Sequence, residues 1–207
     1  MERGKTARTR IVVALTGASG VIYGVRLLEA LRTADGVETH LVLSAPAKRT
    51  LVEETDYAVA DVERLAHVVH DDRNIGAAVA SGSFRTAGMV VAPCSIRTAA
   101  AVASGLTGNL ITRAADVTLK EGRPLLLLVR ETPLHVGHLR TLVALAEMGA
   151  VIFPPLPAFY HRPKQLDDIV RYTVARVLDR LGLPHSLGEE WRGAGPDQLD
   201  DPAGSDA

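Results

Sequence analysis

The amino-acid sequence predicts an α/β fold in which helices cover both faces of a doubly wound parallel sheet. Apolar runs of strand length alternate with stretches in which apolar residues recur at helical spacing, a pattern typical of repeated strand–helix units. Two strand candidates, residues 11–15 and 125–129, are apolar at every position, as expected for strands that are buried on both faces. The length of 207 residues, 47% of them hydrophobic, suits a single domain with a sizeable core.

The first strand–helix unit spans residues 11–32 and reads IVVALTGASGVIYGVRLLEALR. Five apolar residues predict the strand, the TGASG turn follows at residues 16–20, and apolar residues at helical spacing predict a helix over residues 21–32. Free N–H groups and the positive end of this helix would face whatever lies over the turn. Gly17 and Gly20 let the backbone bend and approach a ligand, so the unit predicts an anion-binding loop.

The later elements repeat this alternation. Short apolar runs predict strands at residues 38–43, 68–70, 89–92, 125–129 and 151–153. Helical spacing predicts helices at residues 47–54, 61–66, 98–103, 109–120, 138–148 and 165–181. Asp167 and Asp168 suit the start of the last helix, because negative charge is favourable at a helix N-terminus. Residues 71–83 are polar and Gly-rich and predict an irregular surface segment, and the PPLP run at residues 154–157 excludes regular structure.

The chain ends and the overall charge limit the class of protein. Residues 1–10 predict a flexible basic arm, residues 11–187 the folded domain, and the Gly/Pro/Asp-rich residues 188–207 a mobile acidic tail. The net charge of -1 favours neither nucleic acid nor an anionic membrane as a partner, and no apolar run is long enough to span a bilayer. The lone cysteine, Cys94, excludes an internal disulfide and fits a reducing cytoplasm.

Small or polar residues follow four of the predicted strands. In a doubly wound sheet, ligands bind beyond the carboxyl ends of the strands, where the strand order reverses. The residues at these ends are Gly17, Ala18 and Ser19, then Ser44, then Ser95, Ile96, Arg97 and Thr98, and finally Arg130 with Glu131. The TGASG turn is not a dinucleotide fingerprint, because its glycines are too closely spaced and Ser44 stands where an acidic residue would read a ribose. Taken alone, the turn is equally compatible with a tight bend that binds nothing.

The PCSIRT segment at residues 93–98 begins a helix directly after a strand. The hydroxyls of Ser95 and Thr98 could cap this helix, which is the commoner reason for such residues, or could hold a phosphate. Cys94 has no obvious activating base, and we interpret it as a small buried residue rather than a nucleophile. Arg130 and Glu131 directly follow an apolar strand, and a charged pair in that position favours a functional role.

Several cations and one tyrosine are candidates for a second anion site. Arg113 and Lys120 fall on a predicted helix, where charges usually face solvent. Tyr160 follows the PPLP run and could donate a hydrogen bond to a phosphate. Arg176 lies among apolar residues of the last helix; a solvent-facing side chain is the default, but it could point towards an anion. The HVGH segment at residues 135–138 has a metal-ligand spacing without an accompanying carboxylate or thiolate set, so no metal site is predicted.

With these residues in view, the chain resembles the flavin prenyltransferases, the UbiX/Pad family. The matching blocks are TGASGVIYGVRLLEAL, LVLS…EETD, ASGSF…GMVVAPCSIRT, RAADVTLKE, RPLLLLVRETPLH, GAVIFPPLPAFYHRP and ARVLD, spread over residues 11–183. The resemblance implies flavodoxin-like, Rossmann-like subunits that assemble into a dodecamer. It also implies an enzyme that joins the dimethylallyl group of dimethylallyl phosphate to N5 and C6 of reduced FMN without a metal. The product, prenylated FMN, would serve a UbiD-type decarboxylase.

The resemblance also implies roles for individual residues. FMN would be bound by Gly17, Ala18, Ser19, Ser44, Ser95, Ile96, Arg97, Thr98 and Arg130. Dimethylallyl phosphate would be held by Tyr160 and Arg176, with Lys120 and Arg113 close by from a neighbouring subunit. Glu131 is the expected general base, supported by Ser19 or Lys120, and Glu54 matches a further acidic site residue.

Two departures and two alternatives accompany this resemblance. The chain has KEGRP at residues 120–124 where members often have KERRP, and SAPA at residues 44–47 where many have Ser-Lys-Ala-Ala, so each segment lacks a cation. A flavin-dependent cysteine decarboxylase would share the architecture, but it carries Pro-Ala-Ser-Ala-Asn-Thr where this chain has PCSIRT. A non-catalytic FMN carrier would need the phosphate-binding loops but not the second anion site.

Overall fold

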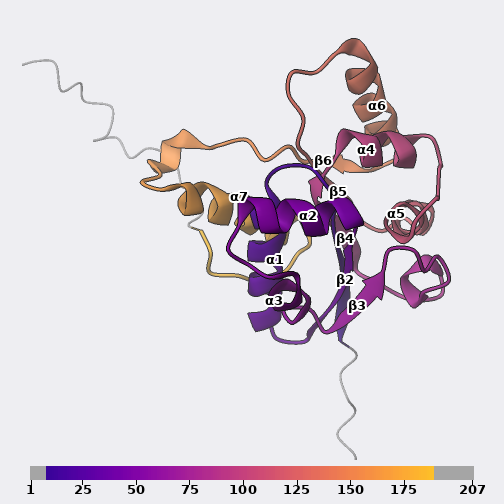
Figure 1. Cartoon of the computed structure of the whole chain (residues 1–207), viewed down its shortest axis with the longest axis horizontal. Coiled ribbons are helices and arrows are strands. Elements are labelled where there is room, and N and C mark those ends of the chain that lie inside the picture. Colours follow the sequence, from indigo (N-terminus) through magenta and orange to yellow (C-terminus); the bar gives the residue numbers. More distant parts are fainter. Residues whose placement is uncertain (1–7, 189–207) are drawn as a thin grey trace, which may run out of the picture.

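The computed structural model describes residues 8–188 and shows a six-stranded sheet with helices on both faces (Figure 1). Neighbouring strands are all parallel. The strands are β1 (Thr9–Leu15), β2 (Val37–Leu43), β3 (Val68–Asp71), β4 (Gly88–Cys94), β5 (Leu125–Val129) and β6 (Val151–Ile152). The α-helices are α1 (Val21–Thr33), α2 (Ala45–Glu54), α3 (Val59–Glu63), α4 (Ile96–Ala103), α5 (Leu110–Lys120), α6 (Val136–Glu147) and α7 (Leu166–Arg180). Two short 3-10 helices are η1 (Ala78–Ala80) and η2 (Phe159–His161).

The strand order is β3-β2-β1-β4-β5-β6, so the chain builds one half of the sheet outward from β1 and then the other half outward from β4. This is the Rossmann order, and the five strands that remain without the short edge strand β3 follow the flavodoxin order. The doubly wound parallel sheet predicted from the sequence is therefore confirmed. The strand order reverses between β1 and β4, which places the expected ligand crevice at their carboxyl ends.

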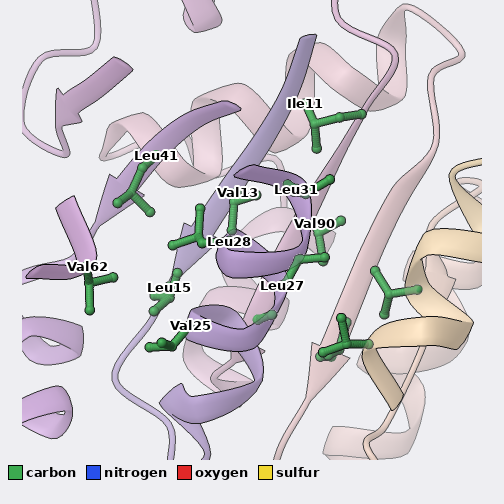
Figure 2. Close-up of a cluster of buried hydrophobic side chains, with 14 of the residues drawn as sticks. Ile11, Val13, Leu15, Val25, Leu27, Leu28, Leu31, Leu41, Val62 and Val90 are labelled. Atoms are coloured by element: carbon green, nitrogen blue, oxygen red, sulfur yellow. The ribbon is translucent and has the colours of Figure 1, made fainter. Parts of the chain in front are cut away.

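The core has two layers, one on each face of the sheet. Successive residues of β1 alternate between them: Ile11, Val13 and Leu15 pack beneath α1 and α7, whereas Val12 and Ala14 pack beneath α4, α5 and α6. Figure 2 shows the first layer, where side chains of α1 lie against β1, β2 and β4. The central strands β4 and β5 bury every residue, so both of their faces need apolar side chains, which explains the unbroken apolar run at residues 125–129.

The structure changes some of the predicted boundaries. All six predicted strands occur, but β1 begins at Thr9, so Thr9 and Arg10 belong to the sheet and not to the basic arm. The reason is a cross-strand ion pair in which Arg10 Nε lies 3.0 Å from Glu38 Oε1, while its guanidinium covers the Phe84 ring at 4.5 Å. The helix predicted at residues 61–66 is the shorter α3 and begins two residues earlier. Residues 1–7 of the arm and the tail after residue 188 lie outside the described residues.

Helix starts are stabilised by polar side chains. The Ser44 hydroxyl accepts from Ala47 N at 3.1 Å at the start of α2, and Asn109 accepts from Thr112 N at 2.9 Å at the start of α5. His135 caps α6 by accepting from Gly137 N at 3.0 Å, so the HVGH segment is a helix start. None of the helices within residues 8–188 is long and apolar enough to cross a membrane.

Candidate functional site

A cleft of about 840 Å³ opens at the carboxyl ends of β1, β2 and β4, the crevice expected from the strand order. Its volume lies in the range of small-molecule pockets in proteins. Five of the residues predicted to bind the cofactor line it: Gly17, Ser44, Ser95, Arg97 and Thr98. Ala100, Ala101 and Leu106 add apolar surface to its lining.

Backbone hydrogen bonds join the four strand ends around this cleft. Ser44 N donates to Leu15 O at 3.1 Å, Thr16 N to Pro93 O at 3.2 Å, and Arg130 N to Cys94 O at 3.1 Å. The donors are the first residues after β2, β1 and β5, so the hydrogen bonding between neighbouring strands continues for one residue beyond these strands. The loops that carry the predicted cofactor-binding residues are therefore held in register with the sheet.

The first turn of α4 offers an open anion site at the cleft. Ser95 accepts from Thr98 N through its hydroxyl at 3.2 Å, and the two hydroxyls lie 3.0 Å apart. The Ile96 and Arg97 amides have no hydrogen-bond partner among residues 8–188. The capping role that the sequence suggested for Ser95 is confirmed. Unpaired amides together with two hydroxyls at a helix N-terminus also suit a phosphate.

The first turn of α1 differs from the prediction, because the protein fills it with its own carboxylate. Glu54 Oε2 accepts from Gly20 N at 2.8 Å and from Val21 N at 3.3 Å. A carboxylate is favourable there for the same electrostatic reason as a phosphate. The Glu54 carboxylate thus occupies the anion site that we expected at the TGASG turn. It is bound to the amide of Gly20, the residue after Ser19.

The turn after β1 and the start of α2 approach each other so closely that position 17 has no room for a side chain. A Cβ built on Gly17 would lie 2.4 Å from Pro46 Cβ, far inside van der Waals contact. Pro46 belongs to the SAPA segment, one of the two departures from the family pattern. The turn after β1 and the start of α2 therefore pack directly on each other at the rim of the cleft.

Arg130 and Glu131 follow β5 and are exposed. Burial raises the pKa of Tyr23 on α1, and the positive charge of Arg130 opposes this rise, so Arg130 lies within electrostatic range of α1. The Glu131 carboxylate accepts only from the neighbouring Thr132 N, at 3.1 Å, among the contacts of the described chain. The Glu131 carboxylate can therefore contact a ligand, whereas the Glu54 carboxylate is hydrogen-bonded to two amides at the start of α1.

Cys94, at the end of β4, was predicted correctly as a buried residue, whereas Asp72 in the cleft was missed. Cys94 is fully buried, and burial raises the pKa of its thiol to about 12, which confirms that it is not a nucleophile at neutral pH. Asp72 lines the cleft but was not predicted, because it falls in the segment that we expected to be irregular. Its carboxylate accepts from Ile111 N at 3.1 Å, and burial raises its pKa. Its position directly after a strand was the signal that could have found it.

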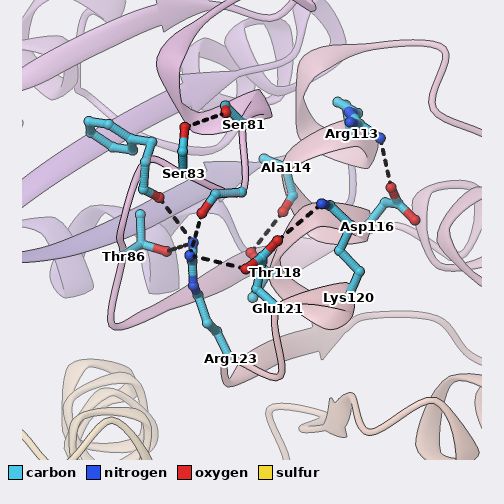
Figure 3. Close-up of polar contacts among 12 residues, drawn as sticks. Ser81, Ser83, Thr86, Arg113, Ala114, Asp116, Thr118, Lys120, Glu121 and Arg123 are labelled. Atoms are coloured by element: carbon cyan, nitrogen blue, oxygen red, sulfur yellow. Dashed lines mark hydrogen bonds and ion pairs between the residues drawn. The ribbon is translucent and has the colours of Figure 1, made fainter.

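The cations of α5 pair with nearby acidic residues (Figure 3). Arg113 pairs with Asp116 at 2.9 Å and Lys120 with Glu121 at 3.0 Å, and neither cation lines the cleft within the described chain. Arg123 donates to Gly82 O at 2.6 Å and holds the ASGSF segment, residues 80–84, against this end of α5.

Tyr160 and Arg176 belong to a second polar cluster. The Tyr160 hydroxyl bonds to the Tyr172 hydroxyl, which raises the pKa of Tyr172, while the Arg176 guanidinium opposes that rise. Arg176 also pairs with Asp179 at 2.7 Å. In Figure 1 this cluster, on α7 and the segment before it, lies on the opposite side of the sheet from α4 and α5. Within the described chain, Tyr160 and Arg176 thus belong to one cluster, and neither lines the cleft at the strand ends.

Comparison with known proteins identifies the family. The flavoprotein family model matches residues 1–178. The flavin prenyltransferase UbiX of Thauera aromatica is 58% identical over 184 residues, which cover 89% of this chain and 94% of the relative. The enzyme of the same name from Salmonella typhimurium is 57% identical over 187 residues, which cover 89% of this chain and 99% of the relative.

The chain belongs to the UbiX flavin prenyltransferase family. The family resemblance of the sequence motifs is therefore confirmed. A dodecameric FMN-dependent UbiX-like decarboxylase from Escherichia coli O157:H7 is a structural neighbour, with a TM-score of 0.88 and 49% identity over 89% of this chain and all of that one. The UbiX protein AnUbiX (PadA1), solved with FMN and dimethylallyl pyrophosphate, has a TM-score of 0.89 and 48% identity over 91% of this chain and all of that one. The FMN-dependent cysteine decarboxylase SpaF, at 18% identity and a TM-score of 0.58, shares the UbiX fold alone.

Proposed function

We propose that this chain is a flavin prenyltransferase that joins the dimethylallyl group of dimethylallyl phosphate to N5 and C6 of reduced FMN. The observation that carries the proposal is the presence of two separate phosphate-binding candidates, the α4 start in the cleft and the Tyr160/Arg176 cluster. Relatives that carry the flavin prenyltransferase name at 57–58% identity support it, as does the neighbour solved with both FMN and a prenyl pyrophosphate.

The cleft has the chemistry that FMN needs. The amides of Ile96 and Arg97 and the hydroxyls of Ser95 and Thr98 can hold the phosphate. Ser44, Gly17 and the adjoining Ala18 and Ser19 border the path of the remaining molecule, and the apolar surface of the lining suits a flat ring. Arg130 lies at the next strand end. When bound, reduced FMN supplies the nucleophilic N5 and C6 positions and an electron-rich face that favours an allylic cation.

The remaining assignments concern the second substrate. Tyr160 and Arg176 bind the phosphate of dimethylallyl phosphate, and Lys120 and Arg113 add positive charge around it. In the first step the allylic C–O bond breaks as the bond to N5 forms, and the phosphate leaves with the electron pair. Fixed cations and a hydroxyl donor stabilise that developing charge. Ring closure would break the double bond of the transferred group: one carbon of that bond would join C6, the other would take up a proton, and C6 would give up its own proton. Glu131 would accept the C6 proton as general base, supported by Ser19 or Lys120 and by Glu54.

Such a site requires more than one copy of the chain. The cleft lies at the carboxyl ends of β1, β2 and β4, and neither Tyr160 nor Arg176 lines it within the described chain, so the cluster of one copy would serve the cleft of another. Exposed apolar side chains on α6, among them Val136, Leu139 and Val143, suit burial between subunits. We propose a homo-oligomer, and specifically a dodecamer like the Escherichia coli O157:H7 neighbour. Light scattering would then give twelve times the chain mass, and a monomer would contradict the shared site.

The product has a defined use in this proposal. Prenylated FMN made here would pass to a UbiD-type decarboxylase as its cofactor. Because the thiol of Cys94 is free, a reducing cytoplasm suits the protein.

The deciding experiment is a mass measurement on the flavin. The protein is incubated under anaerobic conditions with reduced FMN and dimethylallyl phosphate, and the extracted flavin is expected to be heavier by one five-carbon unit. An FMN carrier would bind flavin and return it unchanged. Glu131→Gln should keep FMN affinity and slow ring closure, while Arg176→Ala should weaken use of the prenyl phosphate. Normal product yield from the first variant, or an unchanged KM in the second, would remove that residue from the scheme.

A further inference from the structure

Thr16 is a buried polar residue at the point where the strand order reverses. It is the first residue after β1, only 2% of its surface is exposed, and both capacities of its hydroxyl are used. The hydroxyl donates to Pro93 O at 2.8 Å and accepts from Ser95 N at 2.8 Å. One side chain therefore connects the end of β1 to the last residue before α4.

This bridge determines which amides remain open at the α4 start. Because the Ser95 amide is taken by Thr16, the peptide before α4 is held with its N–H directed towards β1. The Ser95 side chain is then placed to cap Thr98 N, and the next two amides, of Ile96 and Arg97, are left for a ligand. Backbone hydrogen bonds alone do not do this, since Thr16 N reaches only Pro93 O.

We propose that Thr16 is a positioning residue for the phosphate of FMN, acting through Ser95 and the first turn of α4. This inference rests on the proposed placement of that phosphate at α4. Replacement of Thr16 by valine keeps the shape and removes the hydroxyl. It leaves the partly buried Ser95 amide without its partner, and the loss of that hydrogen bond costs free energy. The first turn of α4 can relieve the cost by rotating, which moves its open amides away from the phosphate.

The test compares two flavins that differ in the phosphate. Thr16→Val is expected to raise the Kd for FMN about tenfold, the effect of one buried hydrogen bond, and to change the Kd for riboflavin by less than about twofold. Thr16→Ser retains the hydroxyl and should restore FMN affinity to within about threefold of the wild type.

Thr39→Val is the matched control. Thr39 is also fully buried, and its hydroxyl also bridges two segments, accepting from His67 N at 3.1 Å, but in the amino half of β2. It should lower thermal stability without a selective loss of FMN. An equal loss of FMN and riboflavin in Thr16→Val, no loss of either, or a selective FMN loss in Thr39→Val would each overturn the inference.

If Thr16→Val does not fold, amide exchange on the wild-type protein tests the same inference. Amide exchange should show Ser95 protected without ligand, and Ile96 and Arg97 protected only when FMN is bound. A rapidly exchanging Ser95 amide in the free protein would overturn the inference. The flavin mass assay reports separately on the proposed function, because a protein that holds FMN through Thr16 but returns it unprenylated would refute the transferase and leave this inference standing.

Discussion

Replacing Gly17 by alanine tests the contact that shapes the rim of the cleft. The added Cβ would lie 2.4 Å from Pro46 Cβ and 3.3 Å from the Pro46 carbonyl carbon, so the two loops must separate by about 1 Å to reach ordinary contact. Both loops are held to the sheet by backbone bonds, through Thr16 and Ser44, so neither moves freely. Overpacking of this kind costs about 1–3 kcal/mol of unfolding free energy. Because both loops line the cleft, FMN affinity should fall as well.

A double-mutant cycle separates this clash from other effects of alanine. Urea denaturation and FMN titration are performed on Gly17→Ala, Pro46→Gly and the double variant. Pro46→Gly removes the clashing atom, so the double variant should lose less stability than the sum of the two single changes, by about 1 kcal/mol or more. Gly76→Ala, where the nearest atom to a new Cβ is 3.5 Å away, is the matched control and should change little. Additive losses in the cycle, or an unaffected Gly17→Ala, would refute the reasoning.

Three further predictions follow from buried groups. Burial lowers the pKa of His70 from 6.5, and the neighbouring His40 acts in the same direction, so the unfolded chain binds a proton near pH 6 that the folded chain does not. Stability should therefore fall from pH 7 to pH 5.5, and His70→Gln should flatten this fall in urea midpoints; an equal slope in both proteins would count against it. Cys94, with a pKa of about 12, should resist a thiol reagent at pH 8 in the native protein and react fully in urea; rapid native labelling would be inconsistent with its burial. Arg123→Lys cannot bridge the carbonyls of Gly82 and Phe84, which lie 2.6 and 3.0 Å from the guanidinium, and should cost about 1.5–3 kcal/mol in urea denaturation; a loss below about 0.5 kcal/mol would show that this bridge is not needed.

The fold could be predicted from the sequence because its signals are local. Fully apolar strands such as residues 125–129 report burial on both faces, and helices between them require parallel crossovers. The cleft followed from the same logic, since strand ends at Gly17, Ser44 and Ser95 meet at one edge of such a sheet. The start of β1 was less predictable. In the sequence Arg10 belongs to a basic segment, and only the fold brings it next to its partner Glu38.

The α1 start shows what a local reading misses. An empty helix N-terminus and one filled by a carboxylate have the same TGASG turn. Glu54 lies 34 residues from Gly20 in the sequence, at the far end of α2, and only the packing of α2 against α1 brings it there. Asp72 was missed for a related reason, since its role depends on the α5 backbone amide that it meets.

The cations that we propose for the second substrate illustrate a different limit. Lys120, Arg113 and Arg176 each pair with an acidic residue at most three positions away, and these pairs are exposed or half-buried. Exposed ion pairs contribute little to stability, because water already solvates both charges and each pair must order two long side chains. A phosphate that is partly shielded from water by a second subunit offers these cations a stronger partner, so the local pairs can be exchanged at low cost. Pairing within one copy is therefore compatible with the proposed site completed between copies.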